Sequence, residues 1–192
     1  CIFFSLIYTL KYTWYKNNIK DTKYEKNIVD NLFCNDRTIS ASMLDSNFTN
    51  KGYGQEPTAY RWRYGAWNSN YNNIKLICSS KSDSFSTKNN AFSNNNLRYP
   101  ISMLSSDEII AGGAWWSDNS AYFLYSGVDY WTLSAYYFNG YNADMRYVRQ
   151  TGSIDGARDV SAKDYGVKPT INVSANSLTS GDGTINNPYT VE

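Results

Sequence analysis

The side chains best suited to making contacts in this sequence are tyrosines and asparagines, and many of them lie late in the chain. The 192 residues include 18 Tyr against 8 Phe. Tyr, Ser, Asn and Gly together are typical of adaptable binding surfaces, because Tyr supplies rigid contact area and Asn adapts its hydrogen bonds. We interpret the segment from Ser134 to Asn142, rich in these types, as a loop that presents such a surface. A host codon bias toward Asn, Lys and Tyr would also explain the composition.

Residues suited to catalysis or metal binding are few. The chain contains no His, which excludes Ser–His and Cys–His catalytic arrangements and His-ligated metal sites within it. Carboxylate and cysteine chemistry remain open. Asp182 lies between two glycines with only Glu192 near it in sequence, whereas calcium needs about six to eight oxygen ligands. We therefore predict no metal site and no cofactor.

The net charge of +1 gives no support for a nucleic-acid partner or for attraction to an anionic membrane. Aromatic residues alternate with Arg from Tyr60 to Tyr64. Such a pattern suits contacts to a sugar or a nucleic-acid strand. It equally suits a strand with its aromatic residues facing inward, and the low net charge favours the strand.

The late part of the chain predicts strands that carry the tyrosine-rich segment. Tyr130 to Leu133 is an apolar run of β-favouring residues. Ala143 to Val148 alternates with the two-residue period of a strand. Gln150 to Ser153 predicts a hairpin turn that contains Gly, and Thr170 to Val173 predicts a further strand.

Two helices are expected near the start. Apolar residues at three-four spacing predict an amphipathic helix from Phe3 to about Lys16. Thr22 and Glu25 fit a capping box that opens a second helix ending near Cys34. The apolar face of the first helix would consist of Phe3, Ile7, Leu10 and Trp14. Early helices and late strands indicate an α+β fold.

The middle of the chain predicts short elements and one long surface loop from Ser79 to Asn96. Ser105 and Glu108 fit a capping box that opens a short helix, Asp107 to Ala111, ended by two glycines. The predicted short strands are residues 74–78, 97–104 and 122–125. The length of the chain suits a single domain over residues 1–192, with residues 175–192 as a connector and last strand.

Five segments occur in the order seen in a C-type-lectin-like group, and the chain resembles that group. The group includes formylglycine-generating-type proteins, the variable proteins of diversity-generating retroelements, and surface proteins of Gram-positive gut bacteria. Ala135 and Lys168 stand where the pattern usually has Pro and Arg. The matching segments are residues 33–37, 99–113, 131–135, 166–169 and 181–189. The resemblance implies early helices packed on a small, mostly antiparallel sheet with long loops.

The resemblance also implies a function, that of a non-catalytic module on a bacterial surface or phage-related protein. In variable proteins of this fold the late strands and loop form the ligand face. The corresponding residues here are Tyr136, Tyr137, Asn139, Tyr141, Asn142, Asp144 and Arg146. Their partner would be a protein or a carbohydrate on another cell or host. Calcium-dependent sugar binding is not expected, because the motif at Trp116 to Asp118 lacks the Asn ligand of sugar-binding lectins.

Two other functions belong to the same resemblance. The chain could be a structural segment of a larger adhesin. It could also be a formylglycine-generating-type enzyme, but those enzymes use paired cysteines late in the domain, whereas Cys34 and Cys78 are both early. We therefore predict that the chain is not an enzyme.

An extracellular location has a consequence for the cysteines. It would favour a disulfide between Cys34 and Cys78 with Cys1 left over, and two buried free thiols are the alternative. The sequence does not begin with Met, and we expect a fragment that lacks an upstream strand. A membrane contact is expected only through such a missing segment.

Overall fold

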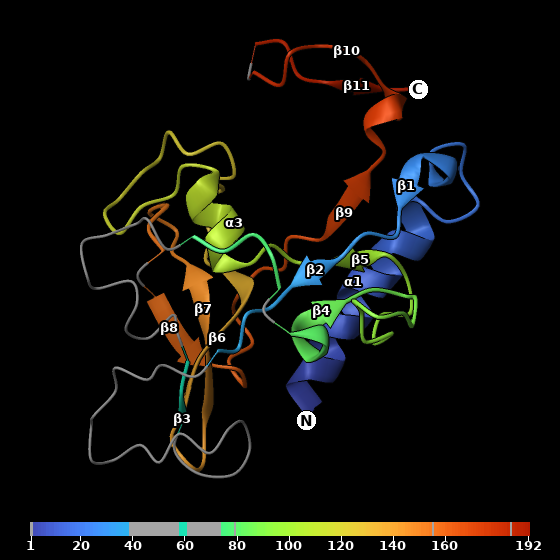
Figure 1. The fold of residues 1–192 in the computed structure, drawn as a ribbon. Coiled ribbons are helices and arrows are strands. Elements are labelled where there is room, and N and C mark those ends of the chain that lie inside the picture. The colour runs from blue at the N-terminus through green and yellow to red at the C-terminus, as the bar shows by residue number, and fades with distance from the viewer. Residues whose placement is uncertain (1, 39–57, 61–73, 79, 155, 185) are drawn as a thin grey trace.

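The computed structural model describes residues 2–38, 58–60, 74–78, 80–154, 156–184 and 186–192 of the chain. Within these residues it confirms the α+β class, with a long helix, a short helix and small antiparallel sheets (Figure 1). None of the helices in the described part of the chain combines the length and the hydrophobicity needed to cross a bilayer.

The largest sheet in the described residues holds the predicted ligand face. Its four strands lie in the order β3-β6-β7-β8, and every neighbouring pair is antiparallel. The strands are β3 (Thr58–Ala59), β6 (Tyr130–Phe138), β7 (Ala143–Val148) and β8 (Gly156–Asp159). The predicted hairpin turn joins β7 to β8, where Gly152 adopts a φ of 86°. We call this the main sheet.

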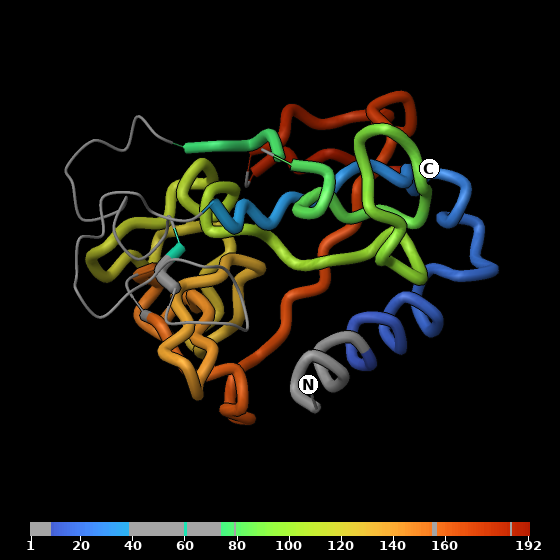
Figure 2. The backbone as a smooth tube through the Cα atoms, turned by 60° about the horizontal axis from the view of Figure 1, so that its bottom comes forward, coloured from blue at the N-terminus to red at the C-terminus, as the bar shows by residue number. Residues whose placement is uncertain are grey.

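The described residues also form three smaller sheets. One has the order β1-β9-β5, and two others are the pairs β2–β4 and β10–β11. Their bounds are β1 (Ile28–Val29), β9 (Thr170–Val173), β5 (Ile101–Ser102), β2 (Phe33–Cys34), β4 (Ser84–Phe85), β10 (Leu178–Ser180) and β11 (Thr190–Val191). The chain leading into β9 leaves the main sheet (Figure 2), and β9 itself lies between β1 and β5. Strands β9 and β11 confirm the predicted late strands.

The predicted loop from Ser134 to Asn142 is mostly strand. Strand β6 continues to Phe138, so only residues 139–142 form the turn into β7. Residues 136–138 are aromatic and favour extended structure, and β3 gives them a second hydrogen-bonding neighbour. The register of β6 against β7 shifts on both sides of Ala135, and such bulges re-aim the side chains that follow them.

The main sheet packs on both faces. On one face, Tyr130 and Val148 pack against Ile109 and Ile110 of α3 (Ser106–Ala111). On the other face, Trp131 and Met145 pack with Met103. A third cluster joins the first helix, α1 (Ile2–Asn18), to β5. Trp131 also contacts the ring of Tyr165 at 4.6 Å between centroids.

The first helix is confirmed, but two residues of its predicted buried face are exposed, and the side chains of the other two, Phe3 and Ile7, lie outside what the structure describes. Leu10 and Trp14 are 50% and 38% exposed, whereas Lys11, Tyr15 and Ile19 are buried. Tyr15 stacks on Tyr99 with 5.2 Å between ring centroids. Apolar spacing alone did not identify the inner face, because aromatic contacts to the segment before β5 orient the helix.

The second predicted helix is wrong. A single 3-10 turn, η1 (Glu25–Asn27), is followed at once by β1. Glu25 accepts a hydrogen bond from the backbone of Asp21 at 2.7 Å, so it closes a turn one residue before the predicted cap. The two residues of β1 are β-branched and pair with Val173 and Asn172 of β9, which stops the helix.

Other local predictions have mixed outcomes. The capping box of Ser105 and Glu108 is confirmed. Residues 74–78 and 122–125 are not strands, and only Ile101–Ser102 of residues 97–104 is. The predicted surface loop contains a 3-10 turn, η3 (Lys81–Asp83), and strand β4. From the alternating segment at 60–64 the structure describes Tyr60 alone, which is buried next to β3.

Lys168 stands where the resemblance predicts Arg, and its side chain has specific contacts. Its ammonium lies 4.0 Å from the centre of the Tyr130 ring and donates a hydrogen bond to the carbonyl of Leu124. Burial lowers the pKa of Lys168. A single donor and a cation–π contact serve here where a bidentate Arg would be expected.

Candidate functional site

Arg146 is a structural residue and does not face a partner as predicted. It is 1% exposed on β7. The guanidinium lies 4.4 Å from the centre of the Tyr136 ring and 5.1 Å from that of Trp116. Its planar cation therefore sits between two aromatic residues, an arrangement that fixes both rings. Tyr136 is half-buried by the same contact, so these two predicted ligand residues act as the frame of the hairpin.

The turn between β6 and β7 is held by Asn139. Its side-chain oxygen accepts hydrogen bonds from the backbone of Tyr141 at 2.9 Å and of Asn142 at 2.6 Å. Its backbone amide donates to the carbonyl of Asn142 at 3.1 Å. Gly140 adopts a φ of 99°, a conformation that suits Gly. Asn139 thus shapes the turn, and its acceptor oxygen is already occupied.

Tyr141 is the most exposed residue of the predicted set. Its side chain is 94% exposed at the tip of the hairpin. A large aromatic side chain gains nothing for folding in this position, because burial is what makes it stabilising. Its backbone amide is held in the turn by the hydrogen bond to the Asn139 side chain.

A polar groove beside the turn contains three of the predicted residues: Tyr137, Asn142 and Asp144. The groove is open, with a volume of about 540 Å³. Its other walls come from β8 and the turn after it: Ala157, Arg158, Asp159, Ser161 and Ala162. We call this the hairpin groove. It combines an aromatic ring, an amide, both signs of charge and a hydroxyl, which suits a hydrogen-bonding ligand.

Three polar residues of the hairpin groove were not predicted: Arg158, Asp159 and Ser161. Asp159 lies opposite Asp144 in the pairing of β7 with β8, and it accepts a hydrogen bond from the backbone of Ser161 at 2.7 Å. The predicted Gly-containing turn before β8 could have identified these residues. A hairpin brings the residues after the turn alongside those before it.

Metal binding was considered for the same residues. Among the described residues, no cluster of three or more His, Cys, Asp or Glu side chains could hold a metal ion. Asp144 and Asp159 are a pair, which falls short of the ligand number of calcium.

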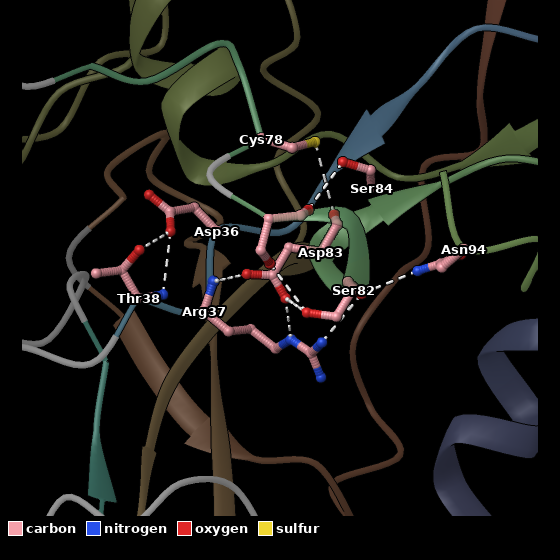
Figure 3. A network of polar contacts seen from close by, with 9 residues as sticks. Asp36, Arg37, Thr38, Cys78, Ser82, Asp83, Ser84 and Asn94 are labelled. Carbon is pink, nitrogen blue, oxygen red and sulfur yellow. Dashed lines mark hydrogen bonds and ion pairs between the residues drawn. The ribbon is translucent and has the colours of Figure 1, made fainter. Parts of the chain in front are cut away.

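A polar network, separate from the main sheet, holds the β2–β4 pair (Figure 3). Cys34 and Cys78 form the expected disulfide. The carboxylate of Asp83 accepts hydrogen bonds from Arg37 Nε at 2.7 Å and from the Arg37 backbone at 3.2 Å. Arg37 also donates to the carbonyl of Ser82 at 3.1 Å. Because Asp83 is buried, this ion pair fixes the segment after β2 against η3.

A second hollow, mostly apolar, lies between that segment, α1 and the main sheet. Its volume is about 220 Å³. Lys11 of α1 and Ala135, Ala143 and Met145 of the main sheet are among its lining residues. Lys11 is 3% exposed, and burial lowers the pKa of its ammonium from 10.5 to about 8. We call this the inner cavity.

Comparisons with known proteins do not extend these observations, since no family model, curated protein or solved structure matches the chain.

Proposed function

We propose that this chain is a non-catalytic binding module with a C-type-lectin-like fold, carried on the outside of a bacterial cell or on a phage-related protein. Its ligand is a protein or a carbohydrate. Tyr141 and the hairpin groove residues Tyr137, Asn142 and Asp144 contact it. The observation that carries the proposal is the 94% exposure of Tyr141 on a turn that two hydrogen bonds to the Asn139 side chain hold together.

The arrangement supports binding because the residues that hold the hairpin in shape differ from those that would contact the ligand. Arg146, Tyr136 and Asn139 are occupied within the protein, so the hairpin needs little ordering when a ligand arrives. Preorganised contacts lose less entropy on binding than mobile ones. Tyr and Asn next to Asp and Arg provide stacking area and hydrogen bonds for either class of ligand.

The test begins with a screen of the purified protein on glycan and protein arrays. For the best ligand found, Tyr141→Ala should weaken binding by about tenfold or more, as loss of an aromatic anchor does. Its thermal midpoint should stay at the wild-type value because the ring is exposed. Tyr24→Ala, at another exposed tyrosine, is the matched control and should bind as the wild type does. Wild-type affinity in Tyr141→Ala would place the ligand face elsewhere.

A structural segment of a larger adhesin is the second candidate. The pair β10–β11 favours it, because this hairpin lies at one end of the molecule away from the main sheet (Figure 1). An array screen without any ligand, together with wild-type assembly of the full-length protein carrying Tyr141→Ala, would favour this role. The enzyme alternative has less support, since Cys34 and Cys78 are bonded to each other.

A further inference from the structure

We propose that the inner cavity binds a neutral, mainly apolar small molecule that carries one hydrogen-bond donor, and that the side-chain oxygen of Asn35 accepts this hydrogen bond. Phenols, alcohols and indoles belong to this class. The site is distinct from the hairpin groove and goes beyond the function proposed above. The cavity is bounded by parts of the chain that are far apart in sequence, from Lys11 of α1 to Val160 after β8.

The walls define the apolar body of the ligand. Two lining residues, Ala135 and Ala143, are small and leave the space open. A dry apolar cavity of about 150 Å³ is enough to bind benzene. The inner cavity, at about 220 Å³, therefore has room for two fused rings or for one ring with a short chain. Filling it would replace lost dispersion contacts along its lining. The larger apolar side chains of the lining are Phe85, Leu97, Met103, Leu133, Met145 and Val160.

Asn35 defines the polar end of the ligand. Its side-chain oxygen is buried and accepts no hydrogen bond from any residue that the structure describes. Its backbone amide donates to the carbonyl of Asp83 at 3.0 Å, which fixes the residue beside η3. Buried acceptors are normally satisfied, and an exception needs an explanation. Because Asn35 belongs to the cavity lining, an O–H or N–H group of a molecule in the cavity can supply the missing donor.

The charged residues of the lining favour a neutral ligand, because each already has a partner within the protein. Arg37 is held by Asp83 and Ser82 in the network of Figure 3. Lys11 and Asp144 also have interactions within the chain. A charged ligand would leave water without gaining a counter-charge that is free to pair with it. Burying such a charge costs far more than burying a hydrogen-bonded hydroxyl or ring N–H group.

The experiment compares indole with benzofuran by isothermal titration calorimetry on the purified protein. The two molecules have nearly the same shape, but benzofuran has an ether oxygen where indole has an N–H donor. Benzofuran would place an acceptor beside the acceptor of Asn35. Indole should therefore bind about fivefold or more tightly than benzofuran, as expected for one hydrogen bond.

Three variants locate the site. Asn35→Leu removes the acceptor and should abolish the preference for indole, while benzofuran binding stays unchanged. This variant should fold, because replacing an unpartnered buried oxygen by an apolar group leaves no polar atom unsatisfied. Asn17→Leu, at an exposed position of α1, is the matched control and should preserve the preference. Ala135→Leu adds bulk to the cavity wall and should weaken both molecules.

Two results would overturn the proposal. The first is a folded wild-type protein, checked by near-ultraviolet circular dichroism, that binds neither molecule or binds both equally. The second is an Asn35→Leu variant that retains the preference. Should that variant fail to fold, the methyl NMR signals of Met103 and Met145 in the wild type decide, because indole in the cavity must shift both. Tyr141→Ala should leave indole binding unchanged, so failure of this site and failure of the hairpin groove are distinguishable.

Discussion

Arg146 shows how one buried cation can shape a binding surface without being part of it. Its guanidinium lies between the rings of Tyr136 and Trp116 and joins β6 to the segment after α3. The resemblance to variable proteins of the C-type-lectin-like group placed it at the predicted ligand face. Its 1% exposure assigns it to the interior.

Arg146→Lys should therefore destabilise the protein although the charge is kept. An ammonium cannot stack on two rings as a planar guanidinium does, and we expect a loss of about 1–3 kcal/mol in the free energy of unfolding. Urea unfolding followed by tryptophan fluorescence measures it. Arg158→Lys, at an exposed position, is the control and should stay within about 0.5 kcal/mol of the wild type. Equal losses in the two variants would contradict the stacking role.

Lys11 predicts a pH dependence of stability. Its folded-state pKa of about 8 lies below the ordinary 10.5, so the unfolded chain binds this proton more tightly. The cost is complete below pH 8 and is relieved as the pH rises from about 8 to about 10.5. At pH 7, Lys11→Met should be more stable than the wild type by up to about 3 kcal/mol.

The measurement compares urea unfolding of the two proteins at pH 7 and at pH 10. The stability difference should shrink strongly at pH 10, and groups that titrate in both proteins cancel. Lys16→Met, at an exposed position, should show no such change. A difference in Lys11→Met that is independent of pH would mean that burial does not perturb the amine.

At the scale of elements, the helices and strands that local sequence signals determine were predictable, and those that depend on tertiary contacts were not. The helix α3 was predictable because its cap is local. The Ser105 hydroxyl accepts a hydrogen bond from the backbone of Glu108, and the Glu108 carboxylate accepts one from the backbone of Ser105. Strands β7 and β9 were predictable from their residue types and alternation. The end of β6 and the replacement of a helix by β1 were not, because both depend on pairing with distant strands.

Ser105→Ala should cost about 1 kcal/mol in the free energy of unfolding, since one side of the capping box is lost. Ser117→Ala, exposed beyond the same helix, is the control and should have little effect. Thermal unfolding by circular dichroism compares them. Equal midpoints for the two variants would show that the cap adds nothing to α3.

The candidate site was also predictable only where its residues follow one another along the chain. Tyr137, Asn142 and Asp144 follow from a tyrosine-rich hairpin read along the chain. Arg158 and Ser161 enter the hairpin groove through the pairing of β7 with β8. Lys11 enters the inner cavity only because aromatic contacts turn α1, which no apolar spacing reveals.

For the whole molecule, the disulfide between Cys34 and Cys78 is the main covalent restraint among the described residues. It joins positions 44 residues apart in sequence and ties the segment before η3 to β2. Closing a loop of this length restricts the unfolded chain, and its loss should cost about 2–4 kcal/mol.

The double variant Cys34→Ser with Cys78→Ser should therefore unfold at a markedly lower temperature than the wild type under non-reducing conditions. Adding a thiol reductant should lower the midpoint of the wild type and leave the double variant unchanged. Cys1→Ser is the control and should behave as the wild type does. A wild-type midpoint that ignores the reductant would contradict the stabilising role.

Strand β7 lies between the two hollows. Ala143 and Met145 line the inner cavity, and Asp144, between them in sequence, lines both spaces. If occupancy of one hollow changes the affinity of the other hollow for its own ligand, thermodynamic linkage requires the second ligand to change the affinity of the first hollow by the same factor.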